Sequence, residues 1–266
     1  MPKLILYALL GYVLLVAVLF IMQRKLLYLP DTRAFDTLQT HPSLIAWPSR
    51  QTFRGWRIEP DGDDIRGTVV IFHGNAGAAS DRVHYAPALG RLGYRVLLAE
   101  YPGYAGRPGH ATEATLVQDA QTTLRLSREA FDGPLIVWGE SLGSGVAAAA
   151  LAENAVDVDA LVLLTPWDSL TTLATSIYWY APVRWLLRDR YDSLRNLASF
   201  RKPVAIIAAE RDRVIPVSHA RALYASLDTP KRLWIWPGAG HNTWPAAPTE
   251  VWWTDVMTFV GSETGE

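Results

Sequence analysis

Apolar residues are distributed along this chain in two recurrent patterns. After an apolar N-terminal segment, short continuous apolar runs alternate with longer stretches in which apolar residues recur every three or four positions. Continuous runs indicate strands buried on both faces, and the periodic stretches indicate amphipathic helices. The expected strands span residues 67–72, 94–99, 134–138, 160–164, 204–208 and 232–236, and the expected helices span residues 80–92, 112–130, 144–153, 218–227 and 249–260. This alternation predicts an α/β fold with a mostly parallel, doubly wound sheet.

The N-terminal apolar segment, residues 4–22, contains no charged residue and is bracketed by Lys3 and by Arg24 and Lys25. As a helix it would extend about 28 Å, close to the ~30 Å thickness of the hydrocarbon core of a bilayer. We expect residues 1–25 to form an uncleaved single-pass transmembrane anchor. One alternative is a cleaved signal peptide, although such peptides have a shorter apolar region that ends in small residues. The other alternative is a buried core helix.

Basic residues flank the anchor on both sides, with Lys3 before it and Arg24, Lys25 and Arg33 after it. The positive-inside rule therefore slightly favours a cytoplasmic location for the rest of the chain, at the cell membrane. Residues 26–49 contain three prolines and no clear periodicity, so we expect an irregular connector. The remaining part, residues 50–266, is of a size suited to one domain.

One stretch, residues 166–200, interrupts the alternation and is longer than an ordinary connection between two strands. It is rich in aromatic residues, including Tyr178, Trp179 and Trp185. Long insertions of this kind often close over a site, so we expect a helical lid, with these three residues as lid candidates and the substrate-binding residues left unassigned. An extra pair of packed helices is the alternative.

Composition excludes several classes of function. The chain has 25 basic and 26 acidic residues, a net charge of −1 and no block of like charge, so a nucleic-acid-binding surface is not expected. It has no cysteine, which excludes disulfides, thiolate metal sites and a cysteine nucleophile. Neither a G-x-G-x-x-G motif nor a Walker motif is present, so a phosphate-binding loop is not expected.

The main chemical motif is G-x-S-x-G at residues 139–143, which follows an expected strand and leads into an expected helix. A serine held at such a sharp turn is exposed for nucleophilic attack. Glycines are needed at positions 139 and 143 because side chains there would crowd the neighbouring strand or helix. The motif alone is short enough to occur by chance, but its position between a strand and a helix makes Ser141 the candidate nucleophile.

A serine nucleophile needs a base, and the base needs a carboxylate to orient it. His241 lies in a glycine-containing loop after the last expected strand, and Asp212 follows the strand expected at 204–208. The order Ser141, Asp212, His241 is that of an α/β-hydrolase triad. Asp168 and Glu210 are the alternative acids.

Two backbone N–H groups are candidates for stabilising the oxyanion of a tetrahedral intermediate. One belongs to Leu142, which follows the nucleophile. The other is expected in the His-Gly-Asn-Ala-Gly loop at residues 73–77, where we expect the N–H of Asn75 and take Ala76 as the alternative. A glycine-rich turn without a catalytic part is the simpler interpretation of this loop.

With these motifs in place, the chain resembles the α/β-hydrolases of the serine hydrolase superfamily. It resembles in particular a membrane-anchored branch with an H-G-N-A-G loop, grouped with serine aminopeptidase-like and monoacylglycerol-lipase-like proteins. The segments that carry the resemblance are residues 73–77, 101–104 and 139–143, Asp212 with Val214 and Pro216, and residues 240–241. The resemblance implies hydrolysis of an ester, thioester or amide through an acyl-enzyme, without a metal or an organic cofactor. Ala105 and Glu100 depart from the usual pattern, where glycine and aspartate are common.

We therefore expect a membrane-anchored serine hydrolase that cleaves a carboxylic ester or thioester, with a small-molecule or lipid-like acyl substrate because the anchor keeps the pocket near the bilayer. A serine peptidase is the alternative enzyme. An aminopeptidase needs a carboxylate for the free amine of its substrate, and Glu140, Asp168 or Asp189 could supply one. A non-catalytic binding or scaffold protein on the same fold is the third possibility.

Overall fold

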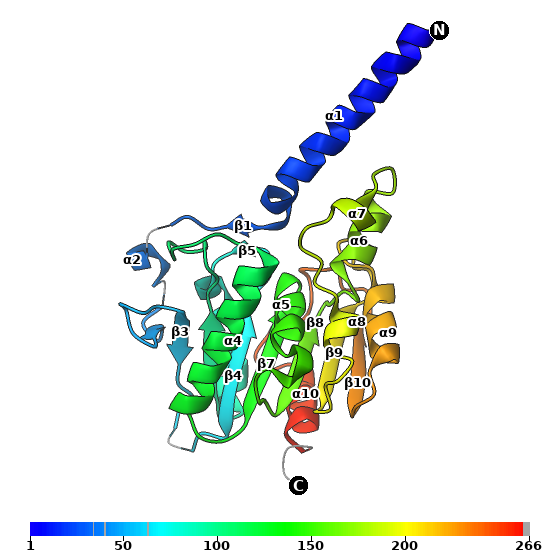
Figure 1. The fold of residues 1–266 in the computed structure, drawn as a ribbon. Helices are drawn as coiled ribbons and strands as arrows, with labels where there is room; N and C mark the ends of the chain where they lie inside the picture. Colours follow the sequence, from blue (N-terminus) through cyan, green and yellow to red (C-terminus); the bar gives the residue numbers. More distant parts are fainter. Residues whose placement is uncertain (34, 40, 63, 263–266) are drawn as a thin grey trace.

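The computed structural model describes residues 1–262 except 34, 40 and 63, and its main element is an eight-stranded sheet (Figure 1). The strands are β2 (Ile45–Trp47), β3 (Gly55–Ile58), β4 (Gly67–Phe72), β6 (Tyr94–Ala99), β7 (Leu135–Glu140), β8 (Ala160–Leu164), β9 (Val204–Ala209) and β10 (Lys231–Trp236). Their order across the sheet is β10-β9-β8-β7-β4-β6-β3-β2. The strands from β10 to β6 are parallel, and β3 and β2 continue the sheet in antiparallel pairing.

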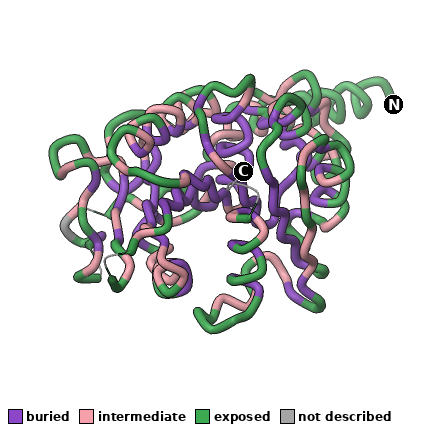
Figure 2. The backbone as a smooth tube through the Cα atoms, turned by 90° about the horizontal axis from the view of Figure 1, so that it is seen from below, coloured by how far each residue is buried: buried purple, intermediate pink, exposed green. Residues whose placement is uncertain are grey.

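Helices cover both faces of this sheet and create two apolar layers (Figure 2). One layer holds α4 (Glu113–Ala130), α5 (Leu142–Ala150) and α9 (Val217–Ser226), and the other holds α3 (Tyr85–Arg91) and α10 (Val251–Ser262). Strand β4 is buried along its whole length, with Val70 and Phe72 in the first layer and Val69 and Ile71 in the second. Burial on both faces is the reason why these strands are continuously apolar in sequence.

The predicted α/β fold with a mostly parallel sheet is confirmed, and all six expected strands are present. The segment expected as one helix over 80–92 is instead a 3₁₀ turn, η1 (Ala79–Arg82), followed by α3. The carboxylate of Asp81 accepts a hydrogen bond from the N–H of Ala78 and closes this turn separately. The helix expected over 144–153 begins earlier and ends at Ala150.

The segment 26–49 differs from the irregular connector that was predicted. It contains β1 (Leu29–Pro30), α2 (Phe35–Leu38) and β2, and β2 is the edge strand of the main sheet. Trp47 on β2 is 4% exposed and packs in the core. The folded domain therefore begins before residue 50.

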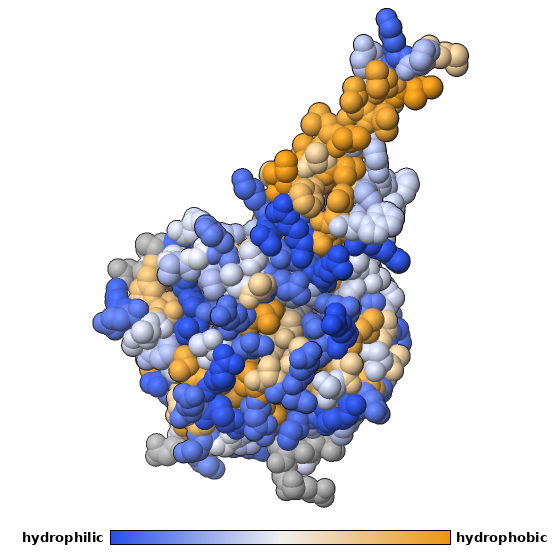
Figure 3. All heavy atoms as spheres, in the orientation of Figure 1, coloured by the Kyte–Doolittle hydropathy of each residue, from blue (hydrophilic) through white to orange (hydrophobic). Residues whose placement is uncertain are grey.

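The N-terminal helix α1 (Pro2–Leu27) projects from the domain and carries the apolar side chains that Figure 3 shows in orange. It is long and apolar enough to cross a membrane, and none of its residues is buried. The core-helix alternative is therefore wrong. A short parallel pairing of β1 with β5 (Ala76–Gly77) joins the end of α1 to the domain.

The insertion 166–200 forms three short helices, α6 (Leu170–Ile177), α7 (Val183–Leu186) and α8 (Ser193–Asn196). Helices α6 and α7 lie beside the base of α1, above the carboxyl ends of the parallel strands (Figure 1). We call residues 166–192 the cap. The guanidinium of Arg24 on α1 forms an ion pair of 2.9 Å with the buried Asp189 of the cap, so the anchor helix and the cap are directly connected.

Candidate active site

Ser141 lies at the sharp turn between β7 and α5. Its φ of 53° and ψ of −113° are strained for a residue with a side chain, as a nucleophile elbow requires. A Cβ on Gly139 would lie 2.5 Å from the carbonyl oxygen of Gly143, and a Cβ on Gly143 would overlap the backbone carbonyl of Phe72. As predicted, both positions need glycine, because helix α5 and strands β4 and β7 approach too closely for side chains there.

Three predicted site residues from separate loops meet in one hydrogen-bonded chain. His241 Nε2 lies 3.0 Å from Ser141 Oγ, and His241 Nδ1 lies 2.6 Å from Asp212 Oδ2. The other oxygen of Asp212 accepts hydrogen bonds of 2.8 Å from the backbone N–H groups of Val214 and Ile215. Both carboxylate oxygens are thus engaged, and the aspartate is held in the orientation that faces the imidazole.

The alternative acids do not reach His241. Asp168 Oδ1 lies 2.7 Å from Nδ1 of His219, and both side chains are buried. Glu210 is exposed and accepts a hydrogen bond from the N–H of Gly238. Of the three candidate carboxylates, only Asp212 is placed to orient the base.

The His-Gly-Asn-Ala-Gly loop runs next to the serine, since a Cβ on Gly74 would lie 3.7 Å from the Cβ of Ser141. The Nδ1–H of His73 donates to the carbonyl of Gly74. In a planar trans peptide the next N–H points the opposite way, so the N–H of Asn75 points away from His73. Leu142 is the first residue of α5, and its N–H has no partner within the helix.

Two tyrosines of the segment 101–104 hold this loop in place. The hydroxyl of Tyr101 donates to the carbonyl of His73 at 2.7 Å, and the hydroxyl of Tyr104 donates to the carbonyl of Asn75 at 2.8 Å. The sequence linked these two motifs only through resemblance, and the hydrogen bonds give the physical reason why they occur together. Glu100 lies beneath the loop, with its Oε1 3.0 Å from Nε2 of His73.

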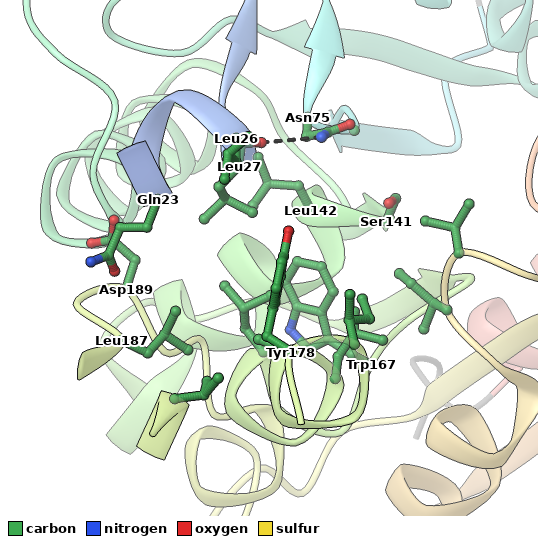
Figure 4. Close-up of a pocket in the computed structure, with 18 of the residues that line it drawn as sticks. Gln23, Leu26, Leu27, Asn75, Ser141, Leu142, Trp167, Tyr178, Leu187 and Asp189 are labelled. Atoms are coloured by element: carbon green, nitrogen blue, oxygen red, sulfur yellow. Dashed lines mark hydrogen bonds between the residues drawn. The ribbon is translucent and has the colours of Figure 1, made fainter. Parts of the chain in front are cut away.

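A cavity of about 630 Å³ extends from Ser141 to the cap and the anchor helix (Figure 4). Its cap wall is largely apolar and includes Trp167, Leu170, Leu173, Tyr178, Val183 and Leu187. Its opposite wall comes from α1 and includes Val16, Leu19, Phe20, Gln23 and Leu27. The sequence analysis missed this second wall.

Of the three aromatic lid candidates, only Tyr178 lines the cavity. Trp179 is 80% exposed and Trp185 is 84% exposed, and neither contributes to the lining. Both residues belong to the cap, and their part in a lid stays a prediction. Trp179 lies in the turn that follows α6 and Trp185 lies within α7, and both side chains are on the outer surface of the cap.

The carboxylates nearest the cavity are already bound within the protein. Glu140 forms two hydrogen bonds of 3.1 Å with the guanidinium of Arg82 and accepts another from the hydroxyl of Tyr85. Burial raises the pKa of the Tyr85 phenol well above its ordinary value, so this hydroxyl remains a donor. Within the described part of the chain, no group of three or more His, Asp or Glu side chains is placed to hold a metal ion.

Residues 63–195, half of the chain, match the family model of serine aminopeptidases, S33. A protein of Mycobacterium tuberculosis with no assigned function is 33% identical over 228 residues, which cover 83% of this chain and 80% of that protein. The chain belongs to the serine aminopeptidase S33 family. The matched range includes Ser141 and the segment 73–77. Asp212 and His241 lie after its end.

Several lipases and esterases are also similar to this chain. The lysophosphatidylserine lipase ABHD12 of Mus musculus is 31% identical over 175 residues, which cover 59% of this chain and 44% of the lipase, so the match spans less than half of that lipase. An esterase of Pyrococcus furiosus superposes with a TM-score of 0.62 at 20% identity, over 90% of this chain and 98% of the esterase. A monoacylglycerol lipase of Paleococcus ferrophilus superposes with a TM-score of 0.57 at 16% identity, over 79% of this chain and 100% of the lipase. The expected α/β-hydrolase fold and family are thereby confirmed.

Proposed function

We propose that this S33-family protein is a membrane-anchored serine esterase that cleaves a carboxylic ester or thioester with a lipid-like acyl group. The observation that carries the proposal is the hydrogen-bonded chain of Ser141, His241 and Asp212, which opens onto a largely apolar cavity. A serine with a base in hydrogen-bond reach is an activated nucleophile, and an apolar cavity favours an acyl chain over a charged substrate.

The hydrogen bonds assign a role to each nitrogen of His241. The carboxylate of Asp212 can only accept, so Nδ1 of His241 donates to it. Nε2 then carries the lone pair, and it accepts the proton of Ser141 Oγ as the oxygen attacks the acyl carbonyl. The resulting imidazolium is stabilised by Asp212 and returns the proton to the leaving alcohol or thiol.

The negative charge on the carbonyl oxygen needs donors that are fixed in advance. We assign this task to the backbone N–H groups of Leu142 and Asn75. Leu142 is at the N-terminus of α5, where the N–H is unpaired within the helix. The loop at Asn75 is held by Tyr101 and Tyr104. Each such donor is typically worth about 3–4 kcal/mol in the transition state.

Hydrolysis of the acyl-enzyme completes the cycle with the same residues. A water molecule takes the position of the leaving group and gives its proton to Nε2 of His241 as it attacks the acyl carbonyl. The proton then passes to Ser141 Oγ as the acyl-oxygen bond breaks, and the carboxylic acid is released.

The membrane anchor is supported by both the composition and the contacts of α1. Besides the ion pair of Arg24 with Asp189, Gln23 accepts a hydrogen bond from the N–H of Arg188 at 2.8 Å. Cleavage as a signal peptide would remove these partners from a cap that is built around them. We therefore favour the retained anchor, with the catalytic domain on the cytoplasmic side as the flanking charges suggest.

The peptidase alternative is weaker because the carboxylates that it needs are occupied. Glu140 is paired with Arg82, Asp189 with Arg24, and Asp168 lies against His219. A substrate ammonium would have to displace one of these partners. The similarity of the chain to lipases and an esterase also supports an ester substrate.

The test is hydrolysis of p-nitrophenyl esters from acetyl to palmitoyl by the full-length protein in detergent. We expect turnover that increases with chain length and is abolished by Ser141→Ala, whereas Ser226→Ala, at an exposed serine of α9, behaves as the wild type. A preference for acetyl over medium and long chains would contradict the lipid-like substrate. Hydrolysis of aminoacyl p-nitroanilides without hydrolysis of esters would select the peptidase.

A further inference from the structure

One face of the anchor helix forms part of the cavity, although the helix is otherwise exposed. Val16, Leu19, Phe20, Gln23 and Leu27 line the cavity, and their spacing of three and four residues places them in a single stripe. All five are half-buried. The stripe faces the cap, whereas Leu14, Val18 and Ile21 on the opposite face are exposed.

The upper part of this stripe lies inside the apolar segment 4–22. Val16 is six residues before Met22, so at ~1.5 Å per residue it lies about 9 Å inside the apolar run. A helix tilt of up to ~40° would shorten this depth by only about a quarter. If residues 4–22 lie in the hydrocarbon layer, the cavity wall extends into that layer as well.

The cap contacts the anchor helix at a point deeper in the apolar segment than Val16. The hydroxyl of Tyr12 donates a hydrogen bond of 3.0 Å to the backbone carbonyl of Tyr180. Tyr12 is ten residues before Met22, which corresponds to about 15 Å, half of the ~30 Å hydrocarbon thickness. The loop between α6 and α7, which contains Tyr180, therefore lies beside the middle of the anchor.

The exposed surface of the cap has the chemistry of a membrane-embedded surface. Ile177, Trp179 and Trp185 are 52%, 80% and 84% exposed, so three large apolar side chains of the cap are not covered by the rest of the protein. Exposed apolar side chains of this size are suited to contact with lipid rather than with water. Arg188 places its guanidinium 4.3 Å from the ring centre of Phe20, near the end of the apolar run, where a cation can reach lipid phosphates.

We propose that the anchor helix is a wall of the acyl-binding cavity, and that the acyl chain of the substrate enters this cavity directly from the bilayer, between α1 and the cap. The inference rests on the proposed esterase function. The chain would lie along Val16, Leu19 and Phe20, with its ester at Ser141, where Arg82, Asn75 and Asn242 make the cavity polar. A long-chain lipid would then reach the serine without transferring its tail through water.

A matched pair of substitutions tests the route. Val16→Trp adds bulk on the cavity stripe, and Val18→Trp makes the same change two residues away at a position that is 47% exposed and outside the cavity lining. The full-length protein in phosphatidylcholine vesicles is assayed with p-nitrophenyl palmitate and acetate. We expect Val16→Trp to lower the ratio of palmitoyl to acetyl kcat/KM at least fivefold and Val18→Trp to change it less than twofold. Equal ratios for the two variants would overturn the proposal.

A second measurement does not depend on turnover. Palmitic acid that carries a terminal diazirine is incorporated into the same vesicles with the Ser141→Ala protein and is activated by light. We expect adducts on the buried cap residues Leu170 and Leu173, and Val16→Trp should reduce them. Adducts confined to the exposed face of α1 would overturn the proposal. If the Ser141→Ala protein still hydrolysed the esters at the wild-type rate, the proposed function would be refuted. The adduct pattern would still decide the route of the acyl chain.

Discussion

Asp212→Asn should abolish most of the activity by reversing the hydrogen-bond polarity of the triad. In the wild type, one oxygen of Asp212 accepts from the N–H groups of Val214 and Ile215, and the other accepts from His241. The asparagine carbonyl must remain on the two backbone donors, so its NH₂ group faces Nδ1. His241 is then forced to accept at Nδ1 and to carry its proton on Nε2, where it faces Ser141 as a donor and cannot act as a base.

The expected fall in kcat follows from the free-energy cost of restoring an acceptor for Nδ1 of His241. Flipping the asparagine amide would restore an acceptor for Nδ1 but would leave the N–H groups of Val214 and Ile215 unpaired, and the buried one at Ile215 alone costs about 1–3 kcal/mol. The stabilising charge beside the imidazolium is lost in either orientation. We therefore expect kcat to fall about 10³–10⁴-fold, which corresponds to about 4–5.5 kcal/mol at 1.36 kcal/mol per factor of ten.

The assay is ester hydrolysis by Asp212→Asn beside Glu210→Gln, a matched amide substitution at an exposed carboxylate two residues away. The control should retain wild-type turnover, and both variants should unfold at temperatures close to that of the wild type, because the two backbone hydrogen bonds at position 212 are kept. A folded Asp212→Asn protein that retains more than a tenth of the wild-type kcat would refute the assignment of this residue.

Three further predictions address the loop, the cap and the topology. Tyr104→Phe removes the hydroxyl that holds the carbonyl of Asn75, and the loss of one hydrogen bond, about 1 kcal/mol, should lower kcat about fivefold with little change in KM. Burial raises the pKa of Glu113 above its ordinary 4.5, so the folded protein binds this proton more tightly than the unfolded chain. The associated stabilisation is complete below pH 4.5 and is lost as the pH rises through the raised pKa. Glu113→Gln should therefore flatten the decline in the free energy of unfolding above pH 4.5, as measured by urea denaturation. An unchanged pH profile would contradict the direction of this pKa shift. A fluorescent protein fused to the C-terminus should fluoresce and a periplasmic phosphatase fused there should be inactive in bacteria, and the reverse pattern would place the domain on the opposite side.

The features that were predictable from sequence are those in which one local pattern has one structural solution. Strand β4 is continuously apolar over residues 69–72 because both of its faces are buried, and the two glycines of G-x-S-x-G fit the tight turn at Ser141. Strands β2 and β3, with three and four residues, are too short and too mixed in polarity to give a periodic signal. The cavity wall on α1 could not be predicted because a uniformly apolar helix has no distinct face in sequence. Likewise, nothing local distinguishes the inward Tyr178 from the outward Trp179.

The short ribbon of β1 and β5 has a practical consequence for preparing the protein. The N–H of Leu29 donates to the carbonyl of Asn75, and the side-chain amide of Asn75 donates in turn to the carbonyl of Leu27, the last residue of α1. Removing the apolar helix to obtain a water-soluble chain would therefore loosen the loop beside the nucleophile and open the cavity to solvent at the same time. Low activity of such a shortened chain would reflect the loosened loop and the opened cavity, and it would say little about the natural substrate. For purification, the helix should be kept and solubilised as part of the enzyme.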